Sequence, residues 1–135
     1  MTAAAPPYHA RHLIADLHGC EGLDDLERVR SALWSAAAAA EATVVDDRFH
    51  SFGPGQGVTG VLILAESHMT IHTWPEHNYA AVDIFMCGLR HDLEAALAAI
   101  EKALRPEQVV SQILARDGAL PAQAPAPEFT TGGRC

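Results

Sequence analysis

The chain has 135 residues, of which 49% are hydrophobic and 19% are charged, a balance typical of a globular protein rather than a disordered one. Its net charge of −8 argues against a general binder of nucleic acids or anionic membranes, because such proteins need a basic face. Its longest apolar run, around residues 36–40, is far shorter than the about 20 residues that a membrane span needs.

The N-terminal third of the chain predicts a strand followed by a helix. Residues 1–10 are rich in Ala and Pro and indicate a loose arm, and residues 11–19 alternate apolar and polar side chains as a strand does. Asp24 or Asp25 is suited to cap a helix that continues to about Ala42. The inner stripe of this helix, with apolar residues three or four apart, is Leu26, Val29, Leu33 and Ala37.

More strands and a second helix follow. The expected strands are residues 43–52, 58–66, 68–74 and 79–87, with turn-forming stretches at 53–57 and 75–78. Asp92 is suited to cap a helix that continues to Leu104. Residues 107–115 predict a last strand, and the Pro, Ala, Gly and Thr content of residues 117–135 indicates a flexible tail.

These elements indicate one domain, expected to span residues 1–116. Runs of adjacent strands favour antiparallel pairing with helices packed on one face of the sheet. The predicted fold class is therefore α+β, a two-layer sandwich with an antiparallel sheet, written in short as β-α-β-β-β-α-β.

The turn at 75–78 predicts a register between the strands on either side of it. If it is a four-residue hairpin loop, Trp74 opposes Tyr79 and, in steps of two residues, Glu66 opposes Cys87. Opposed residues have Cβ atoms only ~4.5–5.5 Å apart. The Cys87 thiol is therefore expected beside the peptide bond that follows Glu66.

The same spacing separates Ser67 from His72. Five extended residues span roughly 17 Å, so the imidazole does not reach Ser67 along a straight strand. If the two groups act together, the chain must bend sharply at 66–68, or a partner strand or subunit must close the gap. On a strand, His68 and His72 also stand about 13 Å apart, which disfavours a shared metal, and we expect no metal site.

The cysteines bear on the cellular compartment. Cys20, Cys87 and Cys135 are an odd set without CxxC spacing, which disfavours a disulfide framework and a cysteine zinc site. The N-terminus lacks the basic-then-apolar order of a signal peptide. A cytoplasmic location is therefore expected.

Two stretches of the sequence, AESHMTIHTWPE and AAVDIFMCG, carry a resemblance to a known family. They are similar to the prokaryotic S-adenosylmethionine decarboxylase proenzymes, and the similarity runs from Phe49 to Gly88 nearly without a break. ARHLIADLHGC at residues 10–20 resembles the opening strand of that family. The resemblance is weak in the first helix and absent from the tail. It implies a self-processing, pyruvoyl-dependent lyase made as a zymogen.

The resemblance implies that the chain cuts itself between Glu66 and Ser67. Ser67 would attack the carbonyl of Glu66, and elimination followed by loss of ammonia would leave a pyruvoyl group, derived from Ser67, at the new N-terminus. His72 matches the proton acceptor for processing. Thr59 stands where the family has a hydroxyl residue, usually Ser, that assists processing, and its extra methyl group leads us to expect slower cleavage.

The resemblance also implies the roles of residues in turnover. The pyruvoyl carbonyl would form a Schiff base with the substrate amine and withdraw electrons as the carboxylate leaves. Cys87 matches the proton donor. Phe52 matches an aromatic that stacks on adenine, Glu76 matches an acid that binds ribose hydroxyls, and Trp74 can line the pocket, where aromatic faces suit a sulfonium cation. The implied reaction converts S-adenosylmethionine to its decarboxylated form, the aminopropyl donor for spermidine and polyamine biosynthesis.

Members of the family assemble as homodimers with active sites near the interface, so a homodimer of cleaved units is expected, each unit made of chains 1–66 and 67–135. The sequence departs from the family pattern beside Glu76, where His77-Asn78 replaces Tyr-Gly, and in the loop after Phe52, which is one residue longer. Neither departure removes a catalytic group.

Two other interpretations stay open. The same pyruvoyl chemistry could decarboxylate another basic amino acid, such as arginine or ornithine. Alternatively, the chain could be an unprocessed regulatory or binding subunit that keeps the pocket without the cofactor.

Overall fold

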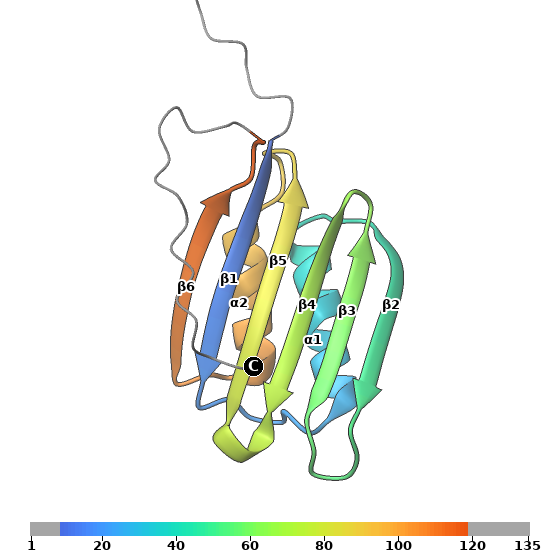
Figure 1. The fold of residues 1–135 in the computed structure, drawn as a ribbon, viewed down its shortest axis with the longest axis vertical. Helices are drawn as coiled ribbons and strands as arrows, with labels where there is room; N and C mark the ends of the chain where they lie inside the picture. Colours follow the sequence, from blue (N-terminus) through green and yellow to red (C-terminus); the bar gives the residue numbers. More distant parts are fainter. Residues whose placement is uncertain (1–8, 119–135) are drawn as a thin grey trace, which may run out of the picture.

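The computed structural model describes residues 9–118, which form a six-stranded antiparallel sheet and two helices (Figure 1). In chain order the elements are β1 (Ala10–His18), α1 (Leu26–Ala39), β2 (Val44–Ser51), β3 (Val58–Leu64), β4 (Ser67–Trp74), η1 (Pro75–His77), β5 (Tyr79–Cys87), α2 (Leu93–Leu104) and β6 (Gln108–Ala115). The strand order across the sheet is β2-β3-β4-β5-β1-β6. Both helices lie on the same face, so the other face of the sheet, called the open face below, has no element of this chain packed on it within residues 9–118.

This architecture confirms the predicted fold class and corrects the short form of its order. Four strands lie between the two helices, as the strands expected at 43–52, 58–66, 68–74 and 79–87 predicted, so the short form β-α-β-β-β-α-β omits one of them. Helix α1 also ends at Ala39 rather than near Ala42, since Glu41 has a left-handed φ of 56° that no helix continues through. The predicted arm and tail lie outside the described residues, except for residues 9–10 and 117–118.

The core lies between the helices and the inner face of the sheet. Of the residues predicted to form the inner stripe of α1, Val29, Leu33 and Ala37 are buried, whereas Leu26 is only partly buried. All predicted inward positions of α2 are buried, namely Leu93, Leu97, Ile100 and Leu104. The side chains of Asp25 and Asp92 accept hydrogen bonds from backbone N–H groups three residues on, so both caps form as expected. Neither helix is long and apolar enough to span a membrane.

The hairpin register of β4 and β5 follows the sequence prediction from the turn up to His68. The pairs are Trp74–Tyr79, His72–Ala81, Thr70–Asp83 and His68–Phe85. Alternation along β4 buries Met69, Ile71 and Thr73 on the inner face. The polar side chains of β4 and β5 therefore lie together on the open face.

Candidate active site

The residues predicted to form a site lie at two ends of the open face. Ser67 and Cys87 stand at the end where the β3–β4 turn reverses the chain and β5 finishes (Figure 1). At the other end, beside the β2–β3 loop and the β4–β5 hairpin, are Phe52, Thr59, His72, Trp74 and Glu76. Five residues of extended β4 separate Ser67 from His72, which is roughly 17 Å. We call the first group the serine half-site and the second the histidine half-site.

The serine half-site begins at a strained turn. Glu66 has a φ of 61°, in the left-handed region that side chains other than Gly, Asn and Asp rarely adopt. Ser67 directly follows and pairs with Leu64 across the turn. The sharp bend is at Ala65–Glu66 and not over 66–68 as expected, since Ser67 and His68 are already part of β4. It folds β4 back along β3, however, and does not bring His72 to Ser67.

Cys87 contacts Ser67 through its backbone. The Cys87 N–H donates to the Ser67 hydroxyl oxygen at 3.0 Å, and the Cys87 side chain is half-buried. The regular β4–β5 ladder ends at His68–Phe85, so the expected Glu66–Cys87 pair is replaced by this contact. The prediction that Cys87 lies beside the Glu66–Ser67 bond is confirmed at the level of the backbone.

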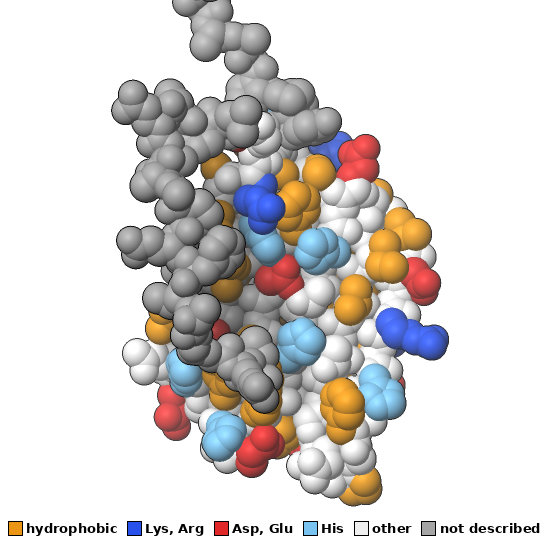
Figure 2. Space-filling view, in the orientation of Figure 1, with side chains coloured by type: hydrophobic (Ala, Val, Ile, Leu, Met, Phe, Trp, Pro, Cys, Tyr) orange, Lys and Arg blue, Asp and Glu red, His pale blue; other side chains and the backbone are white. Residues whose placement is uncertain are grey.

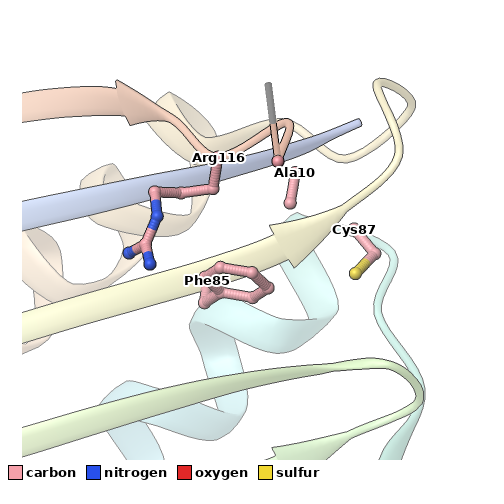
Figure 3. Close-up of a pocket in the computed structure, with 5 residues that line it drawn as sticks. Ala10, Phe85, Cys87 and Arg116 are labelled. Carbon is pink, nitrogen blue, oxygen red and sulfur yellow. The ribbon is translucent and has the colours of Figure 1, made fainter. Parts of the chain in front are cut away.

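A cavity of about 320 Å³ opens beside the serine half-site. It is lined by Ala10, Phe85, Cys87, Arg116 and Gly118. The Arg116 side chain lies over Phe85, and the thiol of Cys87 is on the same side of β5 (Figure 3). The volume is at the lower end of the range for small-molecule sites, and a mostly apolar wall with one cation suits part of an amino acid.

The histidine half-site contains a hydrogen-bonded pair. Thr59 on β3 and His72 on β4 stand directly opposite each other, and the Thr59 hydroxyl lies 3.1 Å from His72 Nδ1. His72 is exposed on the open face. An imidazole with one nitrogen held by a hydroxyl and its edge in solvent is arranged to accept a proton from a group above the sheet.

Aromatic side chains surround this pair. The Trp74 ring stacks on Tyr79 with centroids 5.2 Å apart, and it lies 6.3 Å from the His72 ring. The Tyr79 hydroxyl donates to Asp16 at 2.5 Å, and this bond, with burial, raises the pKa of Tyr79 to about 12. Phe52 is 63% exposed at the end of β2. These rings offer flat apolar faces to a ligand.

A third group, which sequence reasoning missed, connects the two sides of β5. His12 Nε2 lies 2.7 Å from Asp83 Oδ2, and His68 Nε2 lies 3.2 Å from the same oxygen. Thr70 donates to the other carboxylate oxygen. We call these four residues the Asp83 cluster. The β4–β5 register predicts Thr70 opposite Asp83, but nothing local in the sequence predicts that β1 lies beside β5 and delivers His12.

The hydrogen bonds of the cluster favour the charged form of Asp83. Burial of the carboxyl opposes ionisation, but the hydrogen bonds from Thr70, His12 and His68 together outweigh it and lower the pKa of Asp83 below its usual value. A negative charge therefore stands in the middle of the open face. Figure 2 shows this face, where histidine and hydrophobic side chains are spread around acidic ones.

The Asp83 cluster has the residue types of a metal centre, since the ligand atoms of His12, His68 and Asp83 all lie within 4.8 Å of one another. Arg116 opposes that interpretation. Its guanidinium lies 3.2 Å from His12 Nδ1, and because arginine only donates hydrogen bonds, Nδ1 accepts and the proton of the neutral ring sits on Nε2. In that tautomer Nε2 donates to Asp83, and a metal would have to displace both this proton and the contact with Arg116. The arrangement is a hydrogen-bond network.

Comparison with known proteins gives a consistent result. The sequence profile of the S-adenosylmethionine decarboxylase family matches residues 11–117. The chain is 44% identical over 99 residues to an S-adenosylmethionine decarboxylase proenzyme of Thermomicrobium roseum, covering 73% of this chain and 85% of that protein. It is 47% identical over 100 residues to the proenzyme of Methanococcus maripaludis, covering 73% of this chain and 81% of the relative.

A solved structure agrees with the sequence matches. The crystal structure of the adenosylmethionine decarboxylase from Aquifex aeolicus superposes with a TM-score of 0.75 at 33% identity, covering 87% of this chain and 98% of that one. The shared fold, the match over nearly all described residues and the serine half-site at a strained turn lead to one conclusion. The chain belongs to the S-adenosylmethionine decarboxylase family.

Proposed function

We propose that this protein is a pyruvoyl-dependent decarboxylase of S-adenosylmethionine that makes its cofactor from its own Ser67. The observation that carries the proposal is the turn at Glu66–Ser67, in a chain that belongs to this family. A left-handed Glu66 precedes a serine whose hydroxyl lies against the Cys87 amide. A strained peptide next to a positioned hydroxyl is what backbone self-cleavage requires.

The proposed cleavage proceeds by transfer of the Glu66 acyl group. The Ser67 hydroxyl oxygen attacks the Glu66 carbonyl carbon and gives its proton to a base, the peptide C–N bond breaks, and the freed nitrogen takes a proton, which leaves an ester. Removal of the Ser67 α-proton then breaks the bond between the Ser67 Cβ atom and the former hydroxyl oxygen. Glu66 leaves as a carboxylate that includes this oxygen. Water replaces the nitrogen, ammonia leaves, and a pyruvoyl group remains at residue 67. The products are chains 1–66 and 67–135.

The serine half-site fits this group. Residue 67 follows the chain end to be released, and its hydroxyl lies against the amide of Cys87, which lines a cavity of about 320 Å³. When formed, the pyruvoyl group supplies an electron sink for loss of the substrate carboxylate as carbon dioxide. Cys87 then gives its thiol proton to the substrate carbon that lost the carboxylate.

We further propose that each complete site is shared by two copies of the chain. Thr59 and His72 are too far from Ser67 to act on it within one chain. Two copies can pack with their open faces together about a two-fold axis that lies in the plane of the contact. If this axis crosses the strands at right angles near the middle of β4, the histidine half-site of one copy lies over the serine half-site of the other. Such an isologous contact buries both faces by one operation. His72, steadied by Thr59, then accepts the Ser67 proton.

The exposed apolar side chains of the open face support this dimer. On β1 Ile14 is 43% exposed, and on β3 Ile63 is 49% exposed. Both point away from the helices, and their burial in a dimer would be favourable. The same contact would bring Phe52, Trp74 and Glu76 to the substrate, where the rings stack on adenine and face the sulfonium, and Glu76 accepts from ribose hydroxyls.

Intact mass under denaturing conditions tests the proposal most directly. We expect two chains divided at Glu66–Ser67, with the longer one lacking a free N-terminal amine. Ser67→Ala should remain a single chain of 14.4 kDa. A single chain in the unaltered protein would instead support the unprocessed binding-subunit interpretation.

Co-expression of two inactive variants tests whether the site is shared. Alone, Ser67→Ala lacks the nucleophile and His72→Ala lacks the base, so neither should be cut. In a mixed dimer, Ser67 of the His72→Ala chain would meet His72 of the Ser67→Ala chain. We therefore expect cleavage of the His72→Ala chain, and of that chain only, when the two are made together. Absence of cleavage in the mixture would place both groups in one chain.

Carbon dioxide release from labelled S-adenosylmethionine, arginine and ornithine decides the substrate. We expect turnover of S-adenosylmethionine alone, because stacked aromatic rings and an acid suit a nucleoside with a sulfonium charge. Preferential turnover of arginine or ornithine would support the alternative. The half-buried free thiol of Cys87 needs a reducing compartment, and we propose a cytoplasmic location on that ground.

A further inference from the structure

Cleavage at Glu66–Ser67, which this inference takes from the proposed function, removes two constraints on residue 67 and leaves its place in the β3–β4 ladder, opposite Leu64, as the remaining one. The covalent link through the Ala65–Glu66 turn is lost. The Ser67 hydroxyl oxygen leaves with Glu66, so the bond that it accepts from the Cys87 N–H is lost too. His68 becomes the first residue of the new chain that has a side chain able to hold the end of β4.

The His68 side chain contacts residues of both β5 and β1. Its Nε2 donates to Asp83 Oδ2 at 3.2 Å. Its ring lies parallel to the Phe85 ring, with an angle of 6° between the planes and 5.5 Å between centroids. The His12 ring packs edge-on against both, at 6.1 Å from His68 and 5.5 Å from Phe85. The first side chain after the cut is therefore fixed by the two strands beyond it, β5 and β1.

Asp83 is fixed in turn, so that it can hold His68. Its Oδ1 accepts from Thr70, and its Oδ2 accepts from His12 at 2.7 Å. Arg116 donates to His12 Nδ1 and so keeps the proton of His12 on the nitrogen that faces Asp83. Each carboxylate oxygen has a partner, and the hydrogen bonds to this charged group are of the stronger kind.

We propose that the Asp83 cluster anchors the end of chain 67–135 after the cut, and so positions the pyruvoyl group against Cys87. A free strand end frays unless it is tied down. Displacement of a reacting carbon by about 1 Å greatly lowers the rate of the reaction. Asp83, His12 and His68 are positioning residues in this role, because they act through the backbone of residue 67.

The test compares cleaved and uncleaved protein. Asp83→Asn keeps the size of the side chain but removes its charge, and it is made both in the natural sequence and in Ser67→Ala, where the turn stays closed. We expect the amides at the start of β4 to exchange hydrogen about ten- to a hundredfold faster in the cleaved variant than in the cleaved parent, the range for a lost bond to a charged group. In the Ser67→Ala background the same change should have little effect.

Kinetics provide the second measurement. Cleaved Asp83→Asn should lose kcat by a similar factor while KM changes little, because the anchor orients the cofactor and does not bind substrate. His68→Phe keeps the stacking on Phe85 but lacks the bond to Asp83, and should behave in the same way. Asp16→Asn is the control, since it removes another carboxylate of the open face that holds Tyr79 and not His68, and exchange at the start of β4 should not change.

The outcomes separate this inference from the proposed function. If the unaltered protein stays in one chain, the proposed function is wrong, and the results with the Asp83→Asn variant do not change that. If it is cut and the two variants exchange and turn over like the parent, or exchange faster to the same degree in the uncleaved background, the anchor is wrong. If Asp83→Asn and His68→Phe are never cut, the cluster acts before cleavage, which also overturns the proposal.

Discussion

At the scale of single residues, Glu66 has a backbone conformation that is costly for its side chain. A left-handed residue with a Cβ atom costs roughly 1–2 kcal/mol, and cleavage of the next peptide bond can release that energy. Glu66→Gly removes the strain, so we expect cleavage to slow by about 5- to 30-fold, the factor that 1–2 kcal/mol represents. The measurement is the rate at which one chain becomes two.

Glu66→Ala is the matched control, because it also removes the carboxylate but keeps the Cβ atom and hence the strain. It should be cut faster than Glu66→Gly. Equal rates in the two variants would show that the conformation of Glu66 makes no contribution to cleavage.

The two cysteines of the described chain should differ sharply in reactivity. Cys20 is buried, and burial raises the pKa of its thiol to about 11, so very little thiolate is present at neutral pH. Cys87 is half-buried and faces a cavity. In a Cys135→Ser background, iodoacetamide at pH 8 should modify Cys87 and abolish turnover while Cys20 stays unmodified, as peptide mass mapping would report. Modification of Cys20 before Cys87 would contradict this assignment.

At the scale of elements, the approach of β3 to the end of β4 depends on Gly57. A Cβ atom there would lie 2.2 Å from the carbonyl oxygen of Thr73, a backbone atom, so one of the two strands would have to shift. Gly57→Ala should push the start of β3 away from β4 and disturb the Thr59–His72 pair. We expect a loss of about 1–3 kcal/mol in the free energy of unfolding, as for overpacked sites, and slower cleavage.

Denaturant unfolding of the uncleaved Ser67→Ala protein measures this cost without interference from processing. Ala81→Ser, on β5, is a control that adds one atom to a residue that lines a cavity on the open face. A Gly57→Ala protein as stable as its parent would mean that the two strands can separate at no cost.

The local elements and the hairpin register were predictable because each depends on neighbouring residues. The turn chemistry of residues 75–78 fixes the β4–β5 pairing, and strand rise alone separates His72 from Ser67. The place of β1 between β5 and β6 is different, since it depends on pairing across long stretches of chain that no turn specifies. The Asp83 cluster was missed for that reason. The short form of the strand order was one strand short, although all four strands between the helices were predicted from the local sequence.

At the scale of the whole molecule, the open face determines whether a complete site exists. If two copies pack through it, a second negative charge in its middle should prevent assembly, because Ile14 stands directly opposite Asp83 and two like charges buried side by side are costly. Ile14→Glu should therefore be monomeric by light scattering and should remain one chain. Ala38→Glu, on the exposed side of α1, adds the same charge elsewhere and should assemble and be cut normally. An Ile14→Glu protein that still dimerises and is cut would exclude this interface.

The strand order also determines what becomes of the molecule once it is divided. Chain 1–66 would carry β1, β2 and β3, and chain 67–135 would carry β4, β5 and β6, yet these alternate across the sheet as β2-β3-β4-β5-β1-β6. The junctions β3–β4, β5–β1 and β1–β6 all join one product to the other, so the two pieces stay interleaved. A mature molecule that unfolds loses its partner piece by dilution, and its recovery then depends on concentration, whereas the uncut chain refolds alone. Maturation is therefore a one-way step, and the fold must be complete before the cut is made.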